Sequence, residues 1–210
     1  MRFKIKLLLL FLFLFGTTKA QELSGEALIQ QSKGFFNVKL GTFGLNYKKP
    51  NGYTEIFNWY QSAALGKSLL SSPDLQLIDQ DSTTLIYVAI LTLDTNDANI
   101  KKARRWGLLQ NLDKGYLAFV KSYSDTIQNP VKHYTKEEAK HKFNADAAGI
   151  CEVTIWRRNE FKGRYDKCKA LFLNKKNQCN IFIYYFYLKS RQEPIEKEIE
   201  RTSSFLTLKE

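Results

Sequence analysis

Runs of apolar residues predict β-strands along much of the chain. Residues 83–93 (TTLIYVAILTL) are apolar at almost every position, which is typical of a strand buried on both faces near the centre of a sheet. The polar residues 79–82 (DQDS) separate this run from a shorter apolar one at 75–78, so the two runs predict a hairpin. Segments rich in β-branched and aromatic residues predict further strands at 35–47, 52–60, 151–157, 161–168 and 179–188, with a turn between the first two at Pro50, Asn51 and Gly52.

Apolar residues at spacings of three and four predict three helices. The first runs from residue 97 to about 123, and its apolar face consists of Trp106, Leu109, Leu112, Tyr116, Phe119, Val120 and Tyr123. Thr135 and Glu138 have the spacing of a capping box, which predicts a short helix that continues to Phe143. Pro194 suits the first turn of a last helix, whose shared face consists of Ile195, Ile199, Thr202 and Leu206.

The order of these elements indicates the fold class. Consecutive strands with no helices between them favour an antiparallel sheet, and the helical segments must then cover one face of it. We therefore expect a single α+β domain over residues 21–210. In this domain an antiparallel sheet is covered by helices, and the chain ends in a β-hairpin or strand and a C-terminal helix.

The first 20 residues have the layout of a cleaved signal peptide. Arg2, Lys4 and Lys6 precede an apolar run at residues 7–15, and a small residue, Ala20, stands before the expected cut. As a helix this run spans about 14 Å, under half of a bilayer core of about 30 Å, so a membrane anchor is the weaker interpretation. Cleavage predicts an exported protein, periplasmic or secreted, with no later transmembrane segment.

The net charge of the exported chain indicates which classes of partner it can bind. The chain holds 32 lysines and arginines and 21 acidic residues. Four of the basic residues lie in the first 20, which leaves 28 against 21 and a net charge of +7 on the exported chain. A moderately basic exported protein can meet anionic lipids, cell-wall polymers or acidic proteins, although such a charge also serves solubility alone. Nucleic acid is not expected as a partner.

One basic cluster is a candidate anion-binding site. It consists of Lys101, Lys102, Arg104 and Arg105, and Trp106 follows it directly. Basic side chains with aromatic neighbours can bind polyanions. A solvated helix face accounts for the same residues, and it is the simpler interpretation.

Export also decides how the cysteines are interpreted, because an oxidising compartment favours disulfides. If residues 151–168 form a hairpin that turns between Asn159 and Glu160, Cys151 faces Cys168 directly. Opposed Cβ atoms lie about 4.5–5.5 Å apart, slightly beyond disulfide reach. Some local adjustment of the strands is needed to close this distance. With that adjustment we expect a Cys151–Cys168 bridge, and three free thiols are the main alternative.

The third cysteine is expected to be free and buried. A turn at residues 174–177 (NKKN) would set Cys168 opposite Ile183 and Cys179 opposite Phe172, so these two cysteines would not face each other. No histidine lies near the cysteines in the sequence, which argues against a catalytic thiol.

Two motifs match catalytic signatures without the context that those signatures need. LQLIDQDST, at residues 75–83, fits the pattern of haloacid-dehalogenase-type phosphatases, in which Asp79 would attack phosphorus and Asp81 would act as acid and base. Such a site needs a helix after the motif, whereas a strand is predicted there, so a hairpin turn explains the aspartates better. QSAALGKS, at residues 61–68, ends like a phosphate-binding loop but lacks the first glycine of that motif.

No cofactor or metal is expected. The two histidines, His133 and His141, are eight positions apart, and no CxxC, HExxH or EF-hand pattern occurs. His141 falls on the predicted capped helix, where a surface position is the simpler interpretation.

Parts of this sequence resemble two groups of proteins. The extended run into Pro50, Gly52 and Tyr53 and the closing hairpin and helix of residues 164–206 resemble the PsbP-like α+β fold. Members of that group mostly act as binding or assembly subunits, so the resemblance implies no enzyme. The Leu/Phe-rich first 20 residues and the KFNAD segment at 142–146 resemble uncharacterised small exported proteins of Bacteroidota.

These features together predict an exported, non-enzymatic binding or assembly protein of the cell envelope, with a protein or an anionic partner. The alternative is a secreted or periplasmic hydrolase whose active site no motif reveals. Convergent polar groups in a deep apolar pocket would favour the hydrolase. A continuous exposed apolar or basic face would favour binding.

Overall fold

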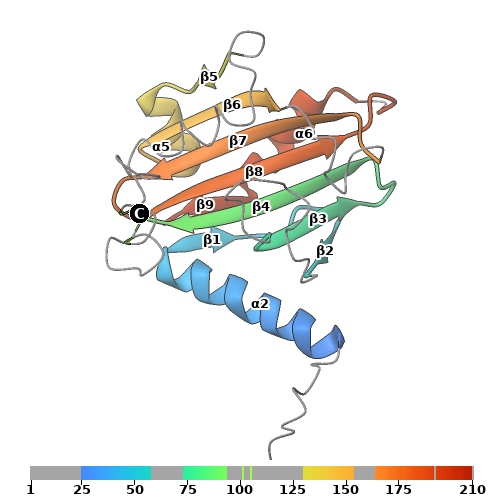
Figure 1. The fold of residues 1–210 in the computed structure, drawn as a ribbon. Coiled ribbons are helices and arrows are strands. Elements are labelled where there is room, and N and C mark those ends of the chain that lie inside the picture. Colours follow the sequence, from blue (N-terminus) through green and yellow to red (C-terminus); the bar gives the residue numbers. More distant parts are fainter. Residues whose placement is uncertain are drawn as a thin grey trace, which may run out of the picture.

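A seven-stranded antiparallel sheet is the centre of the fold. The structure, a computed structural model, describes residues 25–57, 73–93, 101, 105, 130–153, 164–191 and 193–209. Figure 1 shows the strands in the order β2 (Tyr53–Ile56), β3 (Leu75–Asp79), β4 (Thr84–Thr92), β8 (Cys179–Tyr187), β7 (Lys167–Lys175), β6 (Ala147–Val153) and β5 (Lys132–His133). All neighbouring pairs are antiparallel, which confirms the predicted α+β class.

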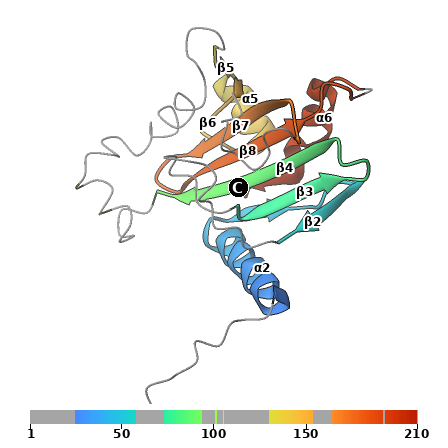
Figure 2. The same ribbon diagram turned by 45° about the vertical axis from the view of Figure 1, so that its right-hand side comes forward.

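A second, two-stranded sheet and the helices complete the described fold. In this sheet β1 (Leu45–Tyr47) pairs with β9 (Leu206–Leu208), so the segment after α2 lies beside the last described strand. The helices are α2 (Gly25–Thr42), α5 (Lys136–Phe143), α6 (Ile195–Thr202) and the short 3₁₀ helix η3 (Ser203–Phe205). Figures 1 and 2 show α5 and α6 on one side of the large sheet and α2 beside β1.

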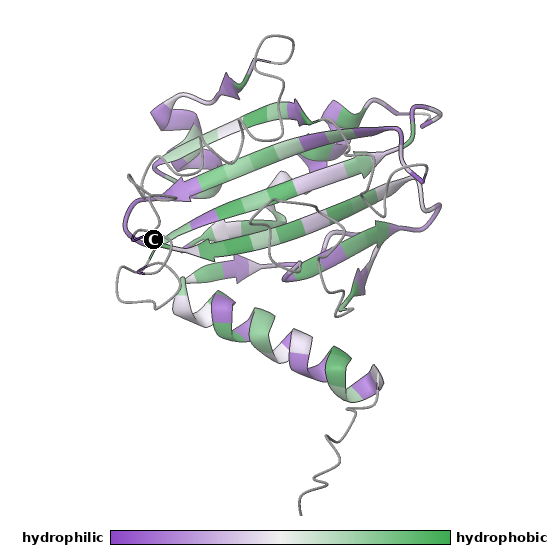
Figure 3. Cartoon of the chain, viewed as in Figure 1, coloured by the Kyte–Doolittle hydropathy of each residue, from purple (hydrophilic) through white to green (hydrophobic). Residues whose placement is uncertain are grey.

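Each face of the large sheet has its own buried core, because successive side chains of a strand point to opposite faces. On β8, Ile181, Ile183 and Tyr185 belong to the first core, whereas Phe182, Tyr184 and Phe186 belong to the second. The first core also contains residues of the helices and the small sheet, namely Phe36, Phe143, Ile195, Ile199 and Leu206. Figure 3 shows the hydrophobic colour continuing along the central strands. The helices therefore cover the first face.

Local sequence signals predicted several elements correctly. Thr135 and Glu138 form the full capping box: the Glu138 N–H donates to Thr135 Oγ1 (3.1 Å), and the Thr135 N–H donates to Glu138 Oε2 (2.8 Å). The predicted turn before β2 is present, with Gly52 at a φ of +80°. The hairpin of β3 and β4 is also confirmed, and Asp79 accepts hydrogen bonds from Thr83 Oγ1 (2.7 Å) and the Thr84 N–H (3.0 Å). This turn leads into a strand, as expected for the hairpin interpretation of the two aspartates.

The strand predicted at residues 35–47 is wrong over most of its length. Helix α2 continues to Thr42, and only residues 45–47 are a strand. Three of its apolar residues, Phe36, Leu40 and Phe43, follow one another at helical spacing and pack in or against the first core. The aromatic and branched residues of FFNV suggested a strand, but burial of this helical stripe determines the structure.

The last helix is shorter than predicted. Ile195, Ile199 and Thr202 share a buried face of α6, as expected. Leu206 does not belong to that face, because the helix ends at Thr202 and Leu206 begins β9. The chain therefore reaches its last described residues as a strand that follows the helix.

Both predicted strand registers near the cysteines are wrong. In the β6–β7 pair, Cys151 lies opposite Ala170 and Cys168 lies opposite Val153, two residues from the expected register. In the β7–β8 pair, Cys168 lies opposite Phe186 instead of Ile183.

The turn between β7 and β8 explains why the register of this pair differs from the prediction. Asn177 adopts a left-handed conformation with a φ of 58°, and Lys175 pairs with Cys179. The turn is therefore tighter and centred later than the NKKN segment suggested. The turn between β6 and β7, with Trp156 and Gly163, lies outside the described residues.

Candidate functional site

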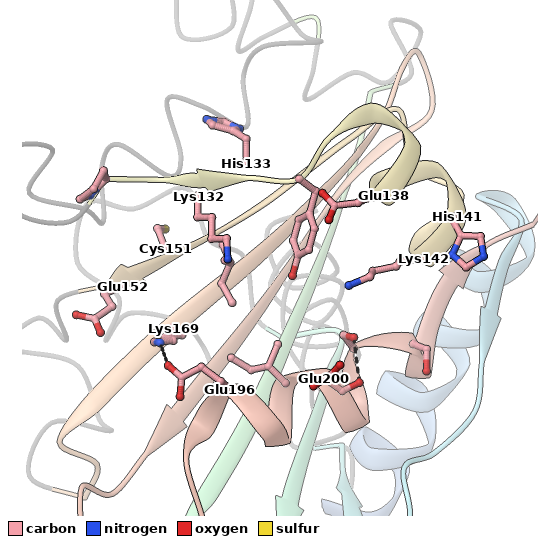
Figure 4. A pocket seen from close by; sticks show the side chains of 16 residues that line it. Lys132, His133, Glu138, His141, Lys142, Cys151, Glu152, Lys169, Glu196 and Glu200 are labelled. Carbon is pink, nitrogen blue, oxygen red and sulfur yellow. Dashed lines mark hydrogen bonds and ion pairs between the residues drawn. The ribbon is translucent and has the colours of Figure 1, made fainter.

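A groove of about 740 Å³ lies between the β5 edge of the sheet and the two short helices (Figure 4). Residues from β5, β6, β7, α5, α6 and η3 line it. Its polar residues include Lys132, Lys142, Lys169, Glu138, Glu152 and Glu200. Its apolar surface is provided by Ile150, Ile199 and the ring of Tyr134. A volume of this size suits a small ligand or a short segment of a partner.

Helix α5 forms one wall, and its capping box fixes where that wall begins. Glu138, His141 and Lys142 are spaced by three and four residues, so they project from one side of the helix into the groove. Ala139 and Phe143 point into the first core and anchor the helix. The capping box and these two core contacts therefore hold the wall in place.

The carboxylate of Glu138 is held in its charged form. The Thr135 N–H, with smaller contributions from Lys142 and Lys132, lowers the pKa of Glu138 below its usual value. Both lysines are exposed. Neither side chain forms an ion pair or a hydrogen bond with another described residue, although the Lys142 ammonium lies 5.4 Å from the centre of the Tyr134 ring.

Tyr134 lies at the base of this wall. Its ring is half-buried and packs edge-on against Phe143, at a centroid distance of 5.6 Å. Burial, together with the charges of Glu138 and Glu200, raises the pKa of the Tyr134 hydroxyl. The hydroxyl therefore stays protonated and can donate a hydrogen bond to a ligand.

The opposite wall comes from α6 and β7. Lys169 forms an ion pair with Glu196, and this hydrogen bond lowers the pKa of the Glu196 carboxyl. Glu152 lies directly opposite Lys169 in the strand register. Directly after α6, the Ser203 hydroxyl donates to the backbone oxygen of Glu200 (3.5 Å). This hydrogen bond does not involve the carboxylate of Glu200.

Cys151 also lines the groove, but it is not poised as a nucleophile. Its side chain is buried, and burial raises the pKa of the thiol to about 11. The thiol is therefore protonated at neutral pH, whereas the thiolate is the reactive form.

The structure brings the two histidines to the same groove, which sequence spacing had not indicated. His133 lies on β5 and His141 on α5, and both are exposed. Within the described ranges no group of three or more histidine, cysteine or acidic side chains is placed to hold a metal ion.

The other predicted site residues lie elsewhere or outside the described ranges. Lys101 and Arg105 are exposed, and Lys102 and Arg104 lie outside the described residues, as do the GKS motif and most of the helix predicted at 97–123. The three cysteines are free and buried. The Cys151–Cys168 bridge stays a prediction, and the direct opposition that suggested it is absent.

Sequence reasoning missed the groove. Its main residues, Lys132, Tyr134, Lys142 and Glu200, come from two distant parts of the sequence and share no motif. The one local signal was the capping box, because it places the side chains that follow Glu138 on a known helix face.

Comparisons with known proteins add little to this description. No protein-family profile matches the chain, and no curated protein matches its sequence. Among the described residues, no helix has the length and apolar character needed to cross a membrane. One solved structure that the chain is similar to is a cyanobacterial PsbP, CyanoP from Synechocystis sp. PCC 6803. The TM-score is 0.36 at 11% identity, over 79% of this chain and 87% of that one. The structure comparison thus finds a PsbP-like neighbour at a low TM-score and low identity, and no comparison bears on the resemblance to proteins of Bacteroidota.

Proposed function

We propose that the protein is an exported, non-enzymatic binding or assembly protein of the cell envelope, and that the groove holds its ligand. The observation that carries this proposal is the exposed pair Lys132 and Lys142, which line the groove without an ion-pair partner among the described residues. Export is supported by the layout of the first 20 residues.

The direction of the pKa shifts suits four side chains of the groove to binding. A general acid or base works best with a pKa near the working pH. In the groove the pKa values of Glu138 and Glu196 are lowered, and those of Tyr134 and Cys151 are raised. All four pKa values are shifted away from neutral pH. The two carboxylates therefore keep their negative charge, and the Tyr134 hydroxyl and the Cys151 thiol keep their protons.

The test uses a variant that fills the groove. Ser204 is exposed and lines the groove from η3, so Ser204→Trp places a bulky ring there without removing a core side chain. Lys197→Trp is the matched control, because Lys197 is exposed on α6 and does not line the groove. Wild type and both variants are screened by thermal shift against a library of metabolites and short peptides.

We expect compounds that raise the Tm of wild type and of Lys197→Trp but not of Ser204→Trp. A parallel esterase and phosphatase panel should show no turnover. Turnover that Ser204→Trp abolishes, with no stabilising compound, would instead establish the hydrolase and overturn the binding proposal.

A further inference from the structure

The groove contains two cations available to a ligand. Figure 4 shows the side chains of Lys132 and Lys142 extending from β5 and α5 toward the space above α6. The Tyr134 hydroxyl, which makes no hydrogen bond to another described residue, lies in the same part of the groove as Lys142. Two ammonium groups and a phenolic donor on one wall suit a carboxylate.

The facing wall offers an available anion. The Glu200 carboxylate is exposed on α6 and has no ion-pair partner among the described residues. It lies close enough to Tyr134 for its charge to raise the pKa of that hydroxyl. The cationic wall and this carboxylate therefore face each other across the groove without being joined.

The mixture of lysines and glutamates in the groove disfavours ligands that carry only positive or only negative charges. Three lysines and four glutamates line the groove. Lys169 and Glu196 neutralise each other. The other charges are those of Lys132 and Lys142 and those of Glu152, Glu200 and Glu138, whose carboxylate is held by the capping box but keeps its charge, so both signs remain in the groove. A polyanion would meet the glutamates and a polycation would meet the lysines, whereas a ligand that carries both charges meets a partner for each.

We propose that the groove binds a small dipolar ligand that carries one carboxylate and one protonated amine. The carboxylate lies against Lys132, Lys142 and the Tyr134 hydroxyl, and the amine lies against Glu200. The aliphatic body between them packs on Ile150 and Ile199, which line the same groove. This inference rests on the proposed function and names the ligand class of that site.

Three probes of nearly equal size test the two charges of the ligand one at a time. Aminohexanoate carries both the carboxylate and the amine, hexanoate only the carboxylate and hexylamine only the amine. Calorimetric titration of the whole protein at low salt should show that aminohexanoate binds more tightly than either singly charged probe, by up to about fivefold, since an exposed charge contact contributes up to about that factor. Lys132→Gln with Lys142→Gln should remove the preference for aminohexanoate over hexylamine. Glu200→Gln should remove its preference over hexanoate. Lys136→Gln and Glu137→Gln, exposed on α5 outside the groove lining, are the matched controls and should change nothing.

The outcomes separate this inference from the proposed function. Binding of hexanoate or hexylamine that equals that of aminohexanoate, but is lost in Ser204→Trp, overturns the dipolar ligand and leaves groove binding intact. Binding of aminohexanoate that is unchanged in all the lysine and glutamate variants also overturns the inference. If neither these probes nor the library gives a Ser204-dependent effect, both proposals fail.

Discussion

Gly149 on β6 shows how one residue sets the packing of the sheet. It lies opposite Phe172 on β7, and a Cβ atom on Gly149 would lie 2.4 Å from Phe172 Cζ. The aromatic ring thus occupies the space over a bare strand position. Phe172 is fully buried in the second core, so the ring has little room to move.

Gly149→Ala should therefore destabilise the protein by about 1–3 kcal/mol, the usual cost of overpacking a core. Gly34→Ala is the control, because nothing lies within 4 Å of its added Cβ in α2. This change should be neutral or stabilising by up to about 1 kcal/mol, since glycine is unfavourable in a helix. Urea unfolding of both variants measures the difference, and equal stability of the two would contradict the packing described for Phe172.

Asp74 is a buried charge that ties α2 to the sheet. Its carboxylate lies 2.6 Å from the Lys39 ammonium and accepts the Ile90 N–H at 2.6 Å. Lys39 also donates to the Ile90 oxygen at 2.8 Å. Burial raises the pKa of Asp74 more than Lys39 and the Ile90 N–H lower it.

A raised pKa in the folded state gives a definite pH dependence. The contribution of Asp74 to stability is fully present below its unfolded pKa, about 3.9, and is lost as the pH rises through the folded pKa. Wild type should therefore lose free energy of unfolding relative to Asp74→Asn as the pH rises through this range. Urea unfolding at a series of pH values tests this. A gain relative to the Asn variant would show that the ion pair outweighs burial.

At the scale of elements, Glu198 anchors α6 to the large sheet. Its carboxylate accepts hydrogen bonds from Tyr53 (2.7 Å), Arg201 (2.6 Å) and Arg191 (3.3 Å). Arg191 also donates to Thr84 on β4. The side chain of Glu198 is only 11% exposed, so its partners would lose a largely desolvated acceptor if it were removed.

Glu198→Ala should destabilise the protein by about 3 kcal/mol, because it leaves Arg191 partly buried without its charge partner. Glu193→Ala removes the exposed partner of Lys197 and should change stability by less than about 0.5 kcal/mol. Chemical denaturation compares the two. Similar values for both would mean that α6 is held by its apolar face alone.

The arrangement of strands also determines which cysteines can join. Cys151 and Cys168 lie diagonally on one face of neighbouring strands, where residues are about 7–8 Å apart and their Cβ atoms somewhat closer. Cys179 belongs to the core on the other face. Mild oxidation of the folded protein should therefore join Cys151 to Cys168 and leave Cys179 free.

Such a bridge requires the strands to shift, so it should add less than the roughly 3 kcal/mol of an unstrained loop of this length. Non-reducing peptide mapping identifies the pair. A linked peptide that contains Cys179 would contradict the placement of the cysteines on two faces.

Sequence predicted those elements whose signals are local. The capping box at Thr135 and the apolar run of β4 depend only on neighbouring residues, and both were found. Helix α2 was missed because the residues of FFNV favour strands while its buried stripe depends on tertiary packing. The β7–β8 register was missed because a turn residue, Asn177, centres the turn later than the NKKN segment suggested and so moves every pair of these two strands.

At the scale of the whole molecule, a second anionic contact is proposed at Lys101, Lys102, Arg104 and Arg105. Lys101 and Arg105 are exposed, as such a contact requires. If these residues bind anionic envelope components, the protein should bind vesicles of anionic lipid. The affinity should fall steeply with salt, because exposed charges are screened within about 8 Å at physiological ionic strength.

Replacing all four with glutamine should abolish vesicle binding and leave the Tm unchanged. Vesicle sedimentation at several salt concentrations measures this. Equal binding by wild type and the quadruple variant would leave these residues as a solvated surface.

The groove could not be predicted from sequence, because only the fold brings β5, α5 and the end of α6 together. The most direct test of its role is a map of backbone amide shifts in NMR spectra, recorded while a compound that stabilises the wild type is added. We predict that the shifts are concentrated at Tyr134, Lys142, Ile150, Ile199 and Ser203, around the groove. Shifts concentrated on α2, or at Lys101 and Arg105, with none around the groove would contradict the account.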